Sequence, residues 1–223
     1  MGLFLNVAKI KLMVIGADQP DNPLIVDGEE VERVTEFNFL GALITQDGGC
    51  KMEIRRRLAM ARSTMVKLSK IWADRGITKA TKIRLVRALV FPIATYGCES
   101  WTLSKADCNK IDAFEMWCWR RMLRIPWTNV SVLQEIGQES RLLSQINRQA
   151  LSYFGHIARR QGTCLEKSIL QGKIEGSRRP GRPKARWTDR IKSLVGQPLP
   201  AVYRMTEDRR RWHVIMDVTT CQS

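Results

Sequence analysis

The chain has 223 residues and carries 37 lysine and arginine side chains against 22 aspartate and glutamate side chains, a formal net charge of +15 at pH 7. Its hydrophobic content of 44% is ordinary for a globular protein and argues against a disordered chain. No apolar run approaches the roughly 18 residues that span a bilayer, and the first residues lack the basic leader of a secretory signal. We therefore expect an intracellular protein, nuclear or cytoplasmic, that does not bind a membrane.

The positive charge is concentrated in one part of the chain. Residues 1–50 hold three basic and eight acidic side chains, a net charge of −5, whereas residues 51–223 hold 34 basic and 14 acidic side chains, a net charge of +20. A surplus of this kind is typical of a surface that binds nucleic acid, because each neutralised phosphate releases counterions. The alternatives are a solubilising surface or a surface for an acidic protein partner.

The first 50 residues have the pattern of short β-strands. Residues 8–15 alternate lysine with apolar side chains before becoming apolar, which predicts a strand with one buried face. Asp27-Gly28 between two apolar stretches is a strong signal for a type I′ hairpin. Residues 37–44 predict another short strand. Together these elements predict a small antiparallel β-hairpin unit.

From Lys51 onward the apolar spacing is helical. One stripe with spacings of three and four comprises Ile54, Leu58, Ala61, Met65, Leu68 and Ile71. Further helices are expected from Thr78 and from Ser104, both plausible N-caps, and Pro92 interrupts the first of these two. Others should begin at Asn129 and cover residues 140–160, 185–195 and 206–218. The expected fold class is therefore α+β and helix-rich.

Two of these helices have well-defined apolar faces. The helix from Ser104 directs Ile111, Phe114, Cys118 and Met122 inward, and the helix over residues 140–160 directs Leu143, Ile146, Ala150, Phe154 and Ile157 inward. Most tryptophans fall within such patterns, which favours packing over base stacking. Residues 173–184 are rich in Gly, Pro and Arg, which predicts an exposed linker.

Several segments together resemble the reverse transcriptase of non-LTR (LINE-type) retrotransposons. The segment Gly2-Leu3-Phe4-Leu5-Asn6-Val7-Ala8-Lys9-Ile10-Lys11-Leu12-Met13 is similar to that family's last palm element, although Ile10 stands where threonine is usual. The other similar segments are Phe39-Leu40-Gly41, Tyr96 to Trp101, Ile111 to Leu123, Tyr153 to Arg159 and Gly181 to Asp189. The resemblance covers nearly the whole chain.

This resemblance implies an organisation of the chain. Residues 1–50 would form the end of the palm and a primer-grip-like β unit, and residues 51–127 the thumb-like helices. The remainder would form a C-terminal helical region over residues 128–175, a basic Gly/Pro/Arg linker over residues 176–184, and short C-terminal helices over residues 185–223.

The same resemblance limits the expected chemistry. In that family the catalytic carboxylates lie upstream of these segments, and this chain contains no Asp-Asp pair. We expect no catalytic residue, cofactor, metal or small-molecule substrate, and no polymerase activity of the chain alone. The predicted function is binding of RNA, DNA or a hybrid duplex. The alternatives are the C-terminal part of an active reverse transcriptase completed by upstream residues, and a non-functional transposon relic or protein-interaction module.

Predicted nucleic-acid-binding residues fall first in the β unit and the first helix. By resemblance, Lys9 would approach the incoming nucleotide, and Phe39, Leu40 and Gly41 would lie against the primer backbone; a solvated lysine and an ordinary hairpin are the alternatives. The basic side chains off the apolar stripe of the first helix could follow the phosphates of a duplex. These are Arg55, Arg56, Arg57, Arg62, Lys67 and Lys70.

A second predicted binding stretch lies in the linker. Gly181-Arg182-Pro183 flanked by basic residues resembles an AT-hook. Proline keeps the backbone extended and glycine removes a side chain, so that Arg182 could enter a narrow A·T minor groove. The predicted residues are Arg178, Arg179, Arg182, Lys184 and Arg186. The alternative is a basic linker ahead of the helix that contains Trp187.

The six cysteines show neither a C-x-x-C pair nor another zinc spacing. Cys118, His156 and Cys164 are too far apart and too irregularly spaced to indicate a metal site. We expect reduced thiols and no bound zinc.

Overall fold

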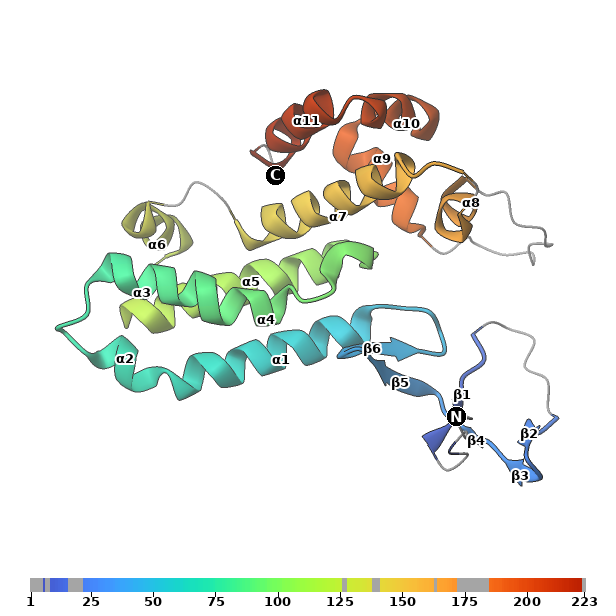
Figure 1. Cartoon of the computed structure of the whole chain (residues 1–223). Coiled ribbons are helices and arrows are strands. Elements are labelled where there is room, and N and C mark those ends of the chain that lie inside the picture. The colour runs from blue at the N-terminus through green and yellow to red at the C-terminus, as the bar shows by residue number, and fades with distance from the viewer. Residues whose placement is uncertain are drawn as a thin grey trace, which may run out of the picture. The chain divides into compact units, whose positions relative to one another are not determined.

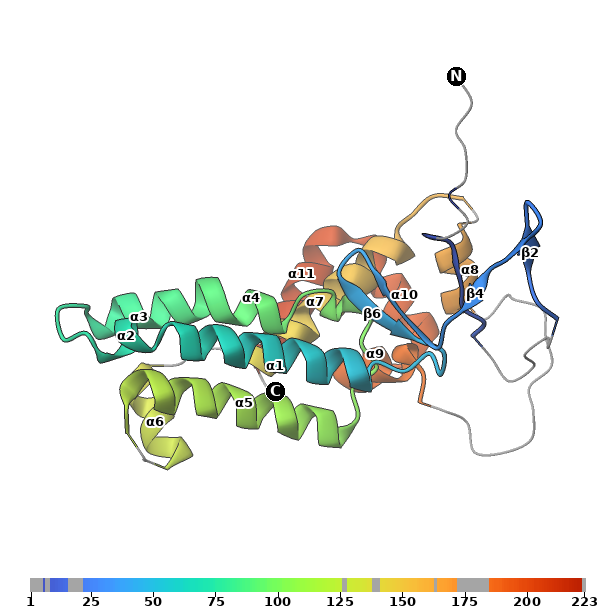
Figure 2. The same cartoon turned by 90° about the horizontal axis from the view of Figure 1, so that it is seen from below.

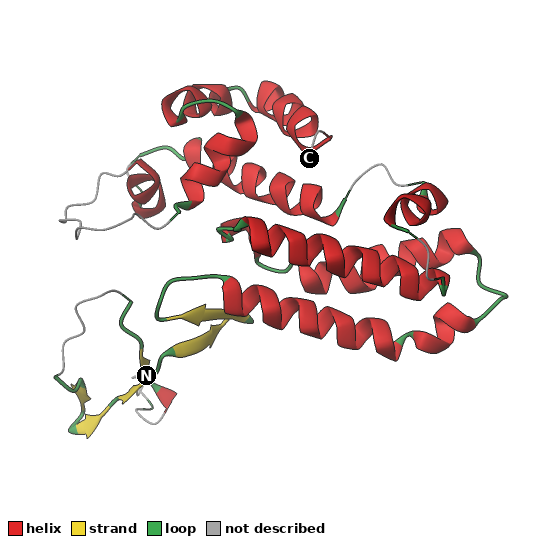
Figure 3. Ribbon diagram, turned by 180° about the vertical axis from the view of Figure 1, so that it is seen from behind, coloured by secondary structure: helices red, strands yellow, loops and turns green. Residues whose placement is uncertain are grey.

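Helices form most of the structure and follow a set of short strands (Figures 1 and 3). The computed structural model describes residues 6, 9–15, 22–125, 128–137, 141–162, 164–171 and 185–221. The chain divides into two compact units, Met1–Arg56 and Arg57–Ser223, which we call the N-terminal unit and the helical unit. This confirms the predicted α+β, helix-rich class, while the finer division into five segments stays a prediction.

The described residues of the N-terminal unit include the short strands β1 (Lys11–Leu12), β2 (Ile25–Val26), β3 (Glu29–Glu30), β4 (Glu32–Arg33), β5 (Glu36–Phe39) and β6 (Ala42–Thr45). Strands β2 and β3 pair antiparallel, as do β5 and β6. Strand β1, however, pairs with β4 in parallel, so the expectation of a purely antiparallel unit was wrong at this pair. The intervening residues 13–31 are long enough for the crossover that parallel pairing requires.

Both hairpins turn through two residues with positive φ. Asp27 and Gly28 have φ of 51° and 82°, and Leu40 and Gly41 have φ of 48° and 82°. A two-residue type I′ turn requires this conformation at both central positions, so the predicted Asp27-Gly28 turn is confirmed. The apolar pattern predicted a single strand over residues 37–44, whereas the structure has a hairpin there, as the resemblance of Phe39-Leu40-Gly41 to a primer-grip hairpin implied. The sequence pattern does not reveal the turn of this hairpin, because leucine, unlike asparagine or aspartate, is unusual in the left-handed region that Leu40 adopts.

The helical segments in chain order are α1 (Lys51–Lys67), α2 (Ser69–Ala73), α3 (Lys79–Leu85), η2 (Val86–Val90), α4 (Phe91–Ala94), η3 (Cys98–Ser100), α5 (Lys105–Leu123), α6 (Asn129–Ile136), α7 (Leu142–Ala158), α8 (Leu165–Gln171), α9 (Trp187–Val195), α10 (Leu199–Glu207) and α11 (Arg209–Cys221). Helices α1 and α2 replace the single helix predicted by the apolar stripe from Ile54 to Ile71. Leu68 breaks it with ψ of 12°, and the Trp72 indole then donates to the Met65 carbonyl at 2.8 Å.

Both predicted N-caps are confirmed. The Thr78 hydroxyl accepts from the Thr81 N–H, and Ser104 forms a capping box with Asp107 at the start of α5. Burial disfavours the charged form of Asp107, but hydrogen bonds from Ser104 and Lys110 more than offset this effect, so its pKa is lowered. The cap therefore contributes its stability above the ordinary carboxylate pKa and loses it as the pH falls through the lowered value.

Pro92 produces a π-helical turn rather than a simple break. Proline has no N–H to continue the α-helical hydrogen-bond pattern, and the Phe91 N–H before it bonds to Val86, five residues back. The segment η2 accommodates this change, and α4 then continues to Ala94.

Helix α7 lies at the centre of the helical unit. It packs against η3 and α5 on one side and against α9, α10 and α11 on the other (Figures 1 and 2). The core on this second side is formed by Ala150, Leu151, Phe154, Ile191, Val202, Trp212 and Met216. Of the predicted inward residues of α7, Ile146, Ala150, Phe154 and Ile157 are buried, but Leu142 is buried in place of Leu143.

A buried carboxylate explains this shift at the start of α7. Glu115 of α5 is 1% exposed, and its carboxylate accepts the Leu142 N–H at 3.0 Å and the Trp119 indole N–H at 3.3 Å. The negative charge satisfies a terminal amide of α7 and lies at the positive end of the helix dipole. The backbone N–H of Leu142 is therefore held against α5.

The other end of α7 contacts α11 at a glycine. A Cβ atom built on Gly155 would lie 2.4 Å from Nε1 and 2.7 Å from Cδ1 of Trp212, whose indole is 1% exposed and donates to the Leu151 carbonyl at 3.1 Å. Only glycine allows the ring to approach the helix so closely.

The sequence-based description was incomplete near the C-terminus. Helix α10 was not predicted. Pro198 and Pro200 occupy its N-cap and first turn, where proline is tolerated. The predicted linker over residues 173–184 lies outside the described residues.

We expect Gly155→Ala to lower the free energy of unfolding by about 1–3 kcal/mol, since the added methyl group must displace the buried Trp212 indole. Urea unfolding followed by tryptophan fluorescence would measure this. Ser152→Ala, at an exposed position of the same helix, is the matched control and should change stability by less than about 0.5 kcal/mol. Equal stability of the two variants would contradict the close packing.

Candidate nucleic-acid interface

The basic side chains predicted on α1 do not form one uniform surface. Within the helical unit, the apolar stripe of Leu58, Ala61 and Met65 is buried, and α1 runs alongside both α4 and α5 (Figures 1 and 2). Arg62 points to the side of α5, where it contacts Trp117, and Lys67 lines a groove on the side of α4. The helical unit thus presents basic groups on two separate edges of α1.

On the α5 edge, two arginines share one indole. The guanidinium carbons of Arg62 and Arg121 each lie 5.5 Å from the centroid of the Trp117 ring. Trp117 is half-buried and stacks on Phe114 at a centroid distance of 6.3 Å, whereas both arginines are exposed. The indole therefore holds two positive charges from different helices close together. We call Arg62, Trp117 and Arg121 the arginine pair site.

On the α4 edge, a groove of about 490 Å³ is lined by Arg57, Met60, Ser63, Thr64, Lys67, Pro92, Ile93 and Tyr96. Arg57, predicted to be an exposed basic residue, is only 6% exposed, and its guanidinium carbon lies 4.3 Å from the Tyr96 ring centroid. That expectation was therefore wrong for Arg57. Tyr96 itself is 50% exposed. We call this feature the Tyr96 groove.

In the N-terminal unit, Arg56 holds the β5–β6 hairpin. Its guanidinium donates to the Gly41 carbonyl at 2.5 Å and to the Glu53 carboxylate at 2.8 and 3.0 Å. The Glu53 carboxylate also accepts the Leu43 N–H, at 3.0 Å. Arg56 is therefore a positioning residue for the hairpin, while Arg55 is exposed.

The hairpin exposes apolar side chains at its tip. Phe39 is 55% exposed and Leu40 is 79% exposed, and the turn holds Leu40 at a positive φ. Lys9 is exposed just before β1. The assignment of Lys9, Phe39, Leu40 and Gly41 to nucleic-acid contacts stays a prediction, as it does for Arg55, Arg62, Lys67 and Lys70; Lys67 and Lys70 are exposed.

Of the linker residues predicted to bind nucleic acid, Arg178, Arg179, Arg182 and Lys184 lie outside the described residues. Arg186 is exposed and donates its backbone N–H to the Asp189 carboxylate at 3.0 Å, at the start of α9. The next residue, Trp187, donates its indole N–H to the Glu99 carbonyl at 2.9 Å.

Three of the segments that carry the family resemblance therefore meet in space. Besides its bond to Glu99, Trp187 contacts the rings of Tyr153 and Phe154 at centroid distances of 6.0 Å. The segments from Tyr96, from Tyr153 and before Asp189 thus share one packing site. The contacts among these segments stabilise the helical unit.

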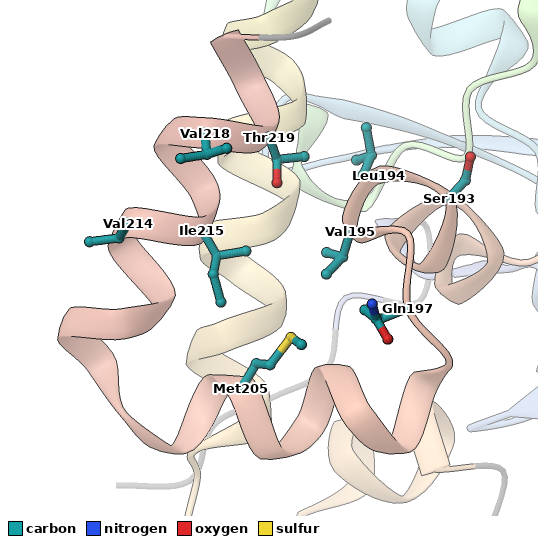
Figure 4. A pocket seen from close by; sticks show the side chains of 9 residues that line it. All are labelled: Ser193, Leu194, Val195, Gln197, Met205, Val214, Ile215, Val218 and Thr219. Atoms are coloured by element: carbon teal, nitrogen blue, oxygen red, sulfur yellow. The ribbon is translucent and has the colours of Figure 1, made fainter.

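Another pocket, of about 540 Å³, lies among α9, α10 and α11 (Figure 4). Its walls include Leu194, Val195, Met205, Ile215 and Val218, and the described residues that line it bear no charge. Such a surface has no positive charge to attract a phosphate, so it is not a candidate for the nucleic-acid interface.

Among the described residues there is no cluster of histidine, cysteine or carboxylate side chains that could hold a metal ion. Free thiols are present at Cys50, Cys98, Cys108, Cys118 and Cys164. Burial, assisted by the charge of Glu99, raises the pKa of the Cys98 thiol to about 12, and burial likewise raises the pKa of Cys118. No helix within the described parts of the chain is long and apolar enough to cross a membrane.

Comparison with known proteins found similarity to a protein whose name describes it as transposon-derived. Over 240 aligned positions the chain is 24% identical to F52C9.6 of Caenorhabditis elegans, whose name describes a transposon-derived protein. The alignment covers 100% of this chain and 86% of that protein. No family model and no solved structure matches the chain.

The sequence interpretation did not identify Tyr96, Trp117 or Arg121 as candidates. Trp117 and Arg121 are four residues apart, a spacing at which helical side chains meet, and this signal could have indicated their contact. No local signal could have indicated that Tyr96 stacks on Arg57.

We expect Glu53→Ala to accelerate hydrogen exchange of the Leu43 amide by about 10–100-fold, because a hydrogen bond to a charged acceptor contributes about 1.5–3 kcal/mol. NMR-detected exchange would measure this rate. Glu36→Ala removes an exposed carboxylate from the same hairpin and should leave the rate unchanged. An unaltered rate in Glu53→Ala would show that the carboxylate does not hold the hairpin.

Alkylation at pH 8 should distinguish the thiols. The raised pKa makes the thiolate fraction of Cys98 roughly a thousandfold smaller than that of an ordinary thiol, so Cys50, Cys108 and Cys164 should react with iodoacetamide well before Cys98 and Cys118. Peptide mass spectrometry over a time course would follow the reaction. Urea should make all five react at similar rates, whereas rapid native labelling of Cys98 would contradict its burial.

Proposed function

We propose that the chain is a nucleic-acid-binding remnant of a transposon-encoded reverse transcriptase, and that it binds the phosphate backbone of RNA, DNA or a hybrid duplex. Two findings support this proposal. The chain is similar along its whole length to a transposon-derived protein, and residues 51–223 carry a net charge of +20. The resemblance of its segments to the end of a LINE-type polymerase accounts for both.

The observation that carries the proposal is the arginine pair site. Arg62 and Arg121 come from separate helices, and their contact with Trp117 restricts both side chains before any ligand arrives. A guanidinium donates up to five N–H groups in a planar fork that matches phosphate geometry, and stacking on an indole face can leave donors at its edge for that purpose. Because phosphates recur along every strand, binding here would be sensitive to salt and nearly independent of sequence.

Polymerisation by this chain alone is not part of the proposal. Nucleotide transfer of the two-metal type requires carboxylates that hold the metal ions, and the chain has no Asp-Asp pair. Our proposal is therefore a binding function without a cofactor.

Charge reversal at the arginine pair site tests the proposal. We expect Arg62→Glu combined with Arg121→Glu to weaken binding of a fluorescent duplex at least about tenfold at 50 mM salt, since two charged contacts are lost. The slope of log K against log salt should decrease in magnitude by about two. Fluorescence anisotropy across a salt series would measure both quantities.

The matched control is Arg204→Glu combined with Arg210→Glu, which makes the same change in net charge at exposed positions of α10 and α11. It should weaken binding much less. An equal loss of binding in both double variants would indicate that net charge attracts the nucleic acid and that the arginine pair site does not bind it. A wild-type chain that binds no nucleic acid at 50 mM salt would refute the proposed function.

A further inference from the structure

We propose that the Tyr96 groove binds one unpaired nucleotide of a single strand, with the base against Tyr96 and the phosphate at Arg57 and Lys67. This inference rests on the proposed function and deepens it. It adds a preference for single-stranded over duplex nucleic acid at a location separate from the arginine pair site.

The size and walls of the groove suit a ligand with one apolar and one charged part. Its volume of about 490 Å³ falls in the range of small-molecule pockets. One wall belongs to α1 and contributes Met60, Thr64 and Lys67, while the other contributes Ile93 and Tyr96. Apolar and aromatic surface thus faces a wall that also carries hydroxyl and ammonium groups.

Arg57 places a fixed positive charge in this groove. Its side chain is 6% exposed yet lines the cavity, and the Tyr96 ring at 4.3 Å holds the guanidinium in place. A guanidinium withdrawn from water interacts more strongly with an anion than an exposed one does, because the surrounding dielectric is lower. Lys67 is exposed in the same groove and adds a second, mobile positive charge.

Tyr96 provides the surface for the base. Its ring is 50% exposed, next to Met60, which is 43% exposed, so apolar area remains in contact with water. Gly97 follows with φ of 69°, in the left-handed conformation, and precedes η3. Stacking of a base on an aromatic side chain contributes about 1–3 kcal/mol and tolerates any base.

These groups together favour an unpaired nucleotide over other ligands. An apolar peptide would cover Tyr96 and Met60 but leave Arg57 and Lys67 facing a ligand without charge. A duplex would offer phosphates, but its base faces are stacked inside the helix and cannot reach Tyr96. An unpaired nucleotide offers a flat aromatic face and an adjacent phosphate, the two features that the groove complements.

Binding of labelled twelve-nucleotide single strands to Tyr96 variants tests the inference. We expect Tyr96→Leu to weaken binding of the single strand about 5–150-fold, the loss that corresponds to one stacked base, and to leave duplex binding unchanged. Tyr96→Phe, which retains the ring, should bind within about twofold of the wild type. Circular dichroism melting of each variant would confirm that it is folded.

Further probes separate the base from the phosphate and a strand from a free nucleotide. A strand of abasic residues should bind the wild type and Tyr96→Leu equally, and Lys67→Ala should reduce the salt slope for the normal strand by about 0.7. Adenosine monophosphate should compete only weakly, since a strand gains additional phosphate contacts. Tight binding of the mononucleotide alone would identify a free nucleotide as the ligand and overturn the strand proposal.

Failure of this inference can be distinguished from failure of the proposed function. If Tyr96→Leu binds single strands as well as the wild type does, the groove is not a nucleotide site, while salt-dependent binding at Arg62 and Arg121 can still hold. If the wild type binds neither duplex nor single strand, both proposals are wrong.

Discussion

The close approach of Trp212 to α7 at Gly155 is the constraint on which the helical unit depends most. The indole lies where a side chain would otherwise be, which brings α11 against α7 and encloses Phe154 in the core with α9 and α10. A buried indole adds a large apolar area to this contact. At its other end, α7 is held by the Glu115 carboxylate of α5. The two contacts fix α7 from both sides.

Helix α5 connects this packing to the candidate interface. Glu115 and Trp119 face the core, whereas Trp117 and Arg121 face outward beside α1. Helix α5, which contacts the start of α7 through Glu115, therefore also carries Trp117, the ring that Arg62 and Arg121 both contact. Because a buried, hydrogen-bonded carboxylate fixes the rotation of α5 about its axis, the position of Trp117 follows from the core rather than from a flexible loop.

Net charge describes this protein less well than the placement of each charge. Arg56 donates to a carbonyl and a carboxylate, Arg57 stacks on Tyr96, and Arg160 pairs with Glu166. Arg190 donates to Asn147 within the helical unit. These cations help to hold the fold. The positive charge that could attract phosphates is therefore smaller than the formal net charge of +15. The location of the basic side chains on two edges of α1 matters more than their total charge.

Local patterns in the sequence determined the helix-rich class, the Asp27-Gly28 turn and the caps at Thr78 and Ser104, because these features depend on neighbouring residues. They also determined the four predicted apolar positions of α5 and four of the five predicted for α7. They did not determine the parallel β1–β4 pair, the burial of Arg57 or the role of Gly155. The candidate site was only partly predictable: Arg62 and Lys67 were identified, but Tyr96, Trp117 and Arg121 were not. Apart from the Trp117–Arg121 contact within α5, tertiary packing decided these cases. Arg57 and Arg62 each stack on a ring from a distant segment, and the sequence neighbours of a residue do not contain that information.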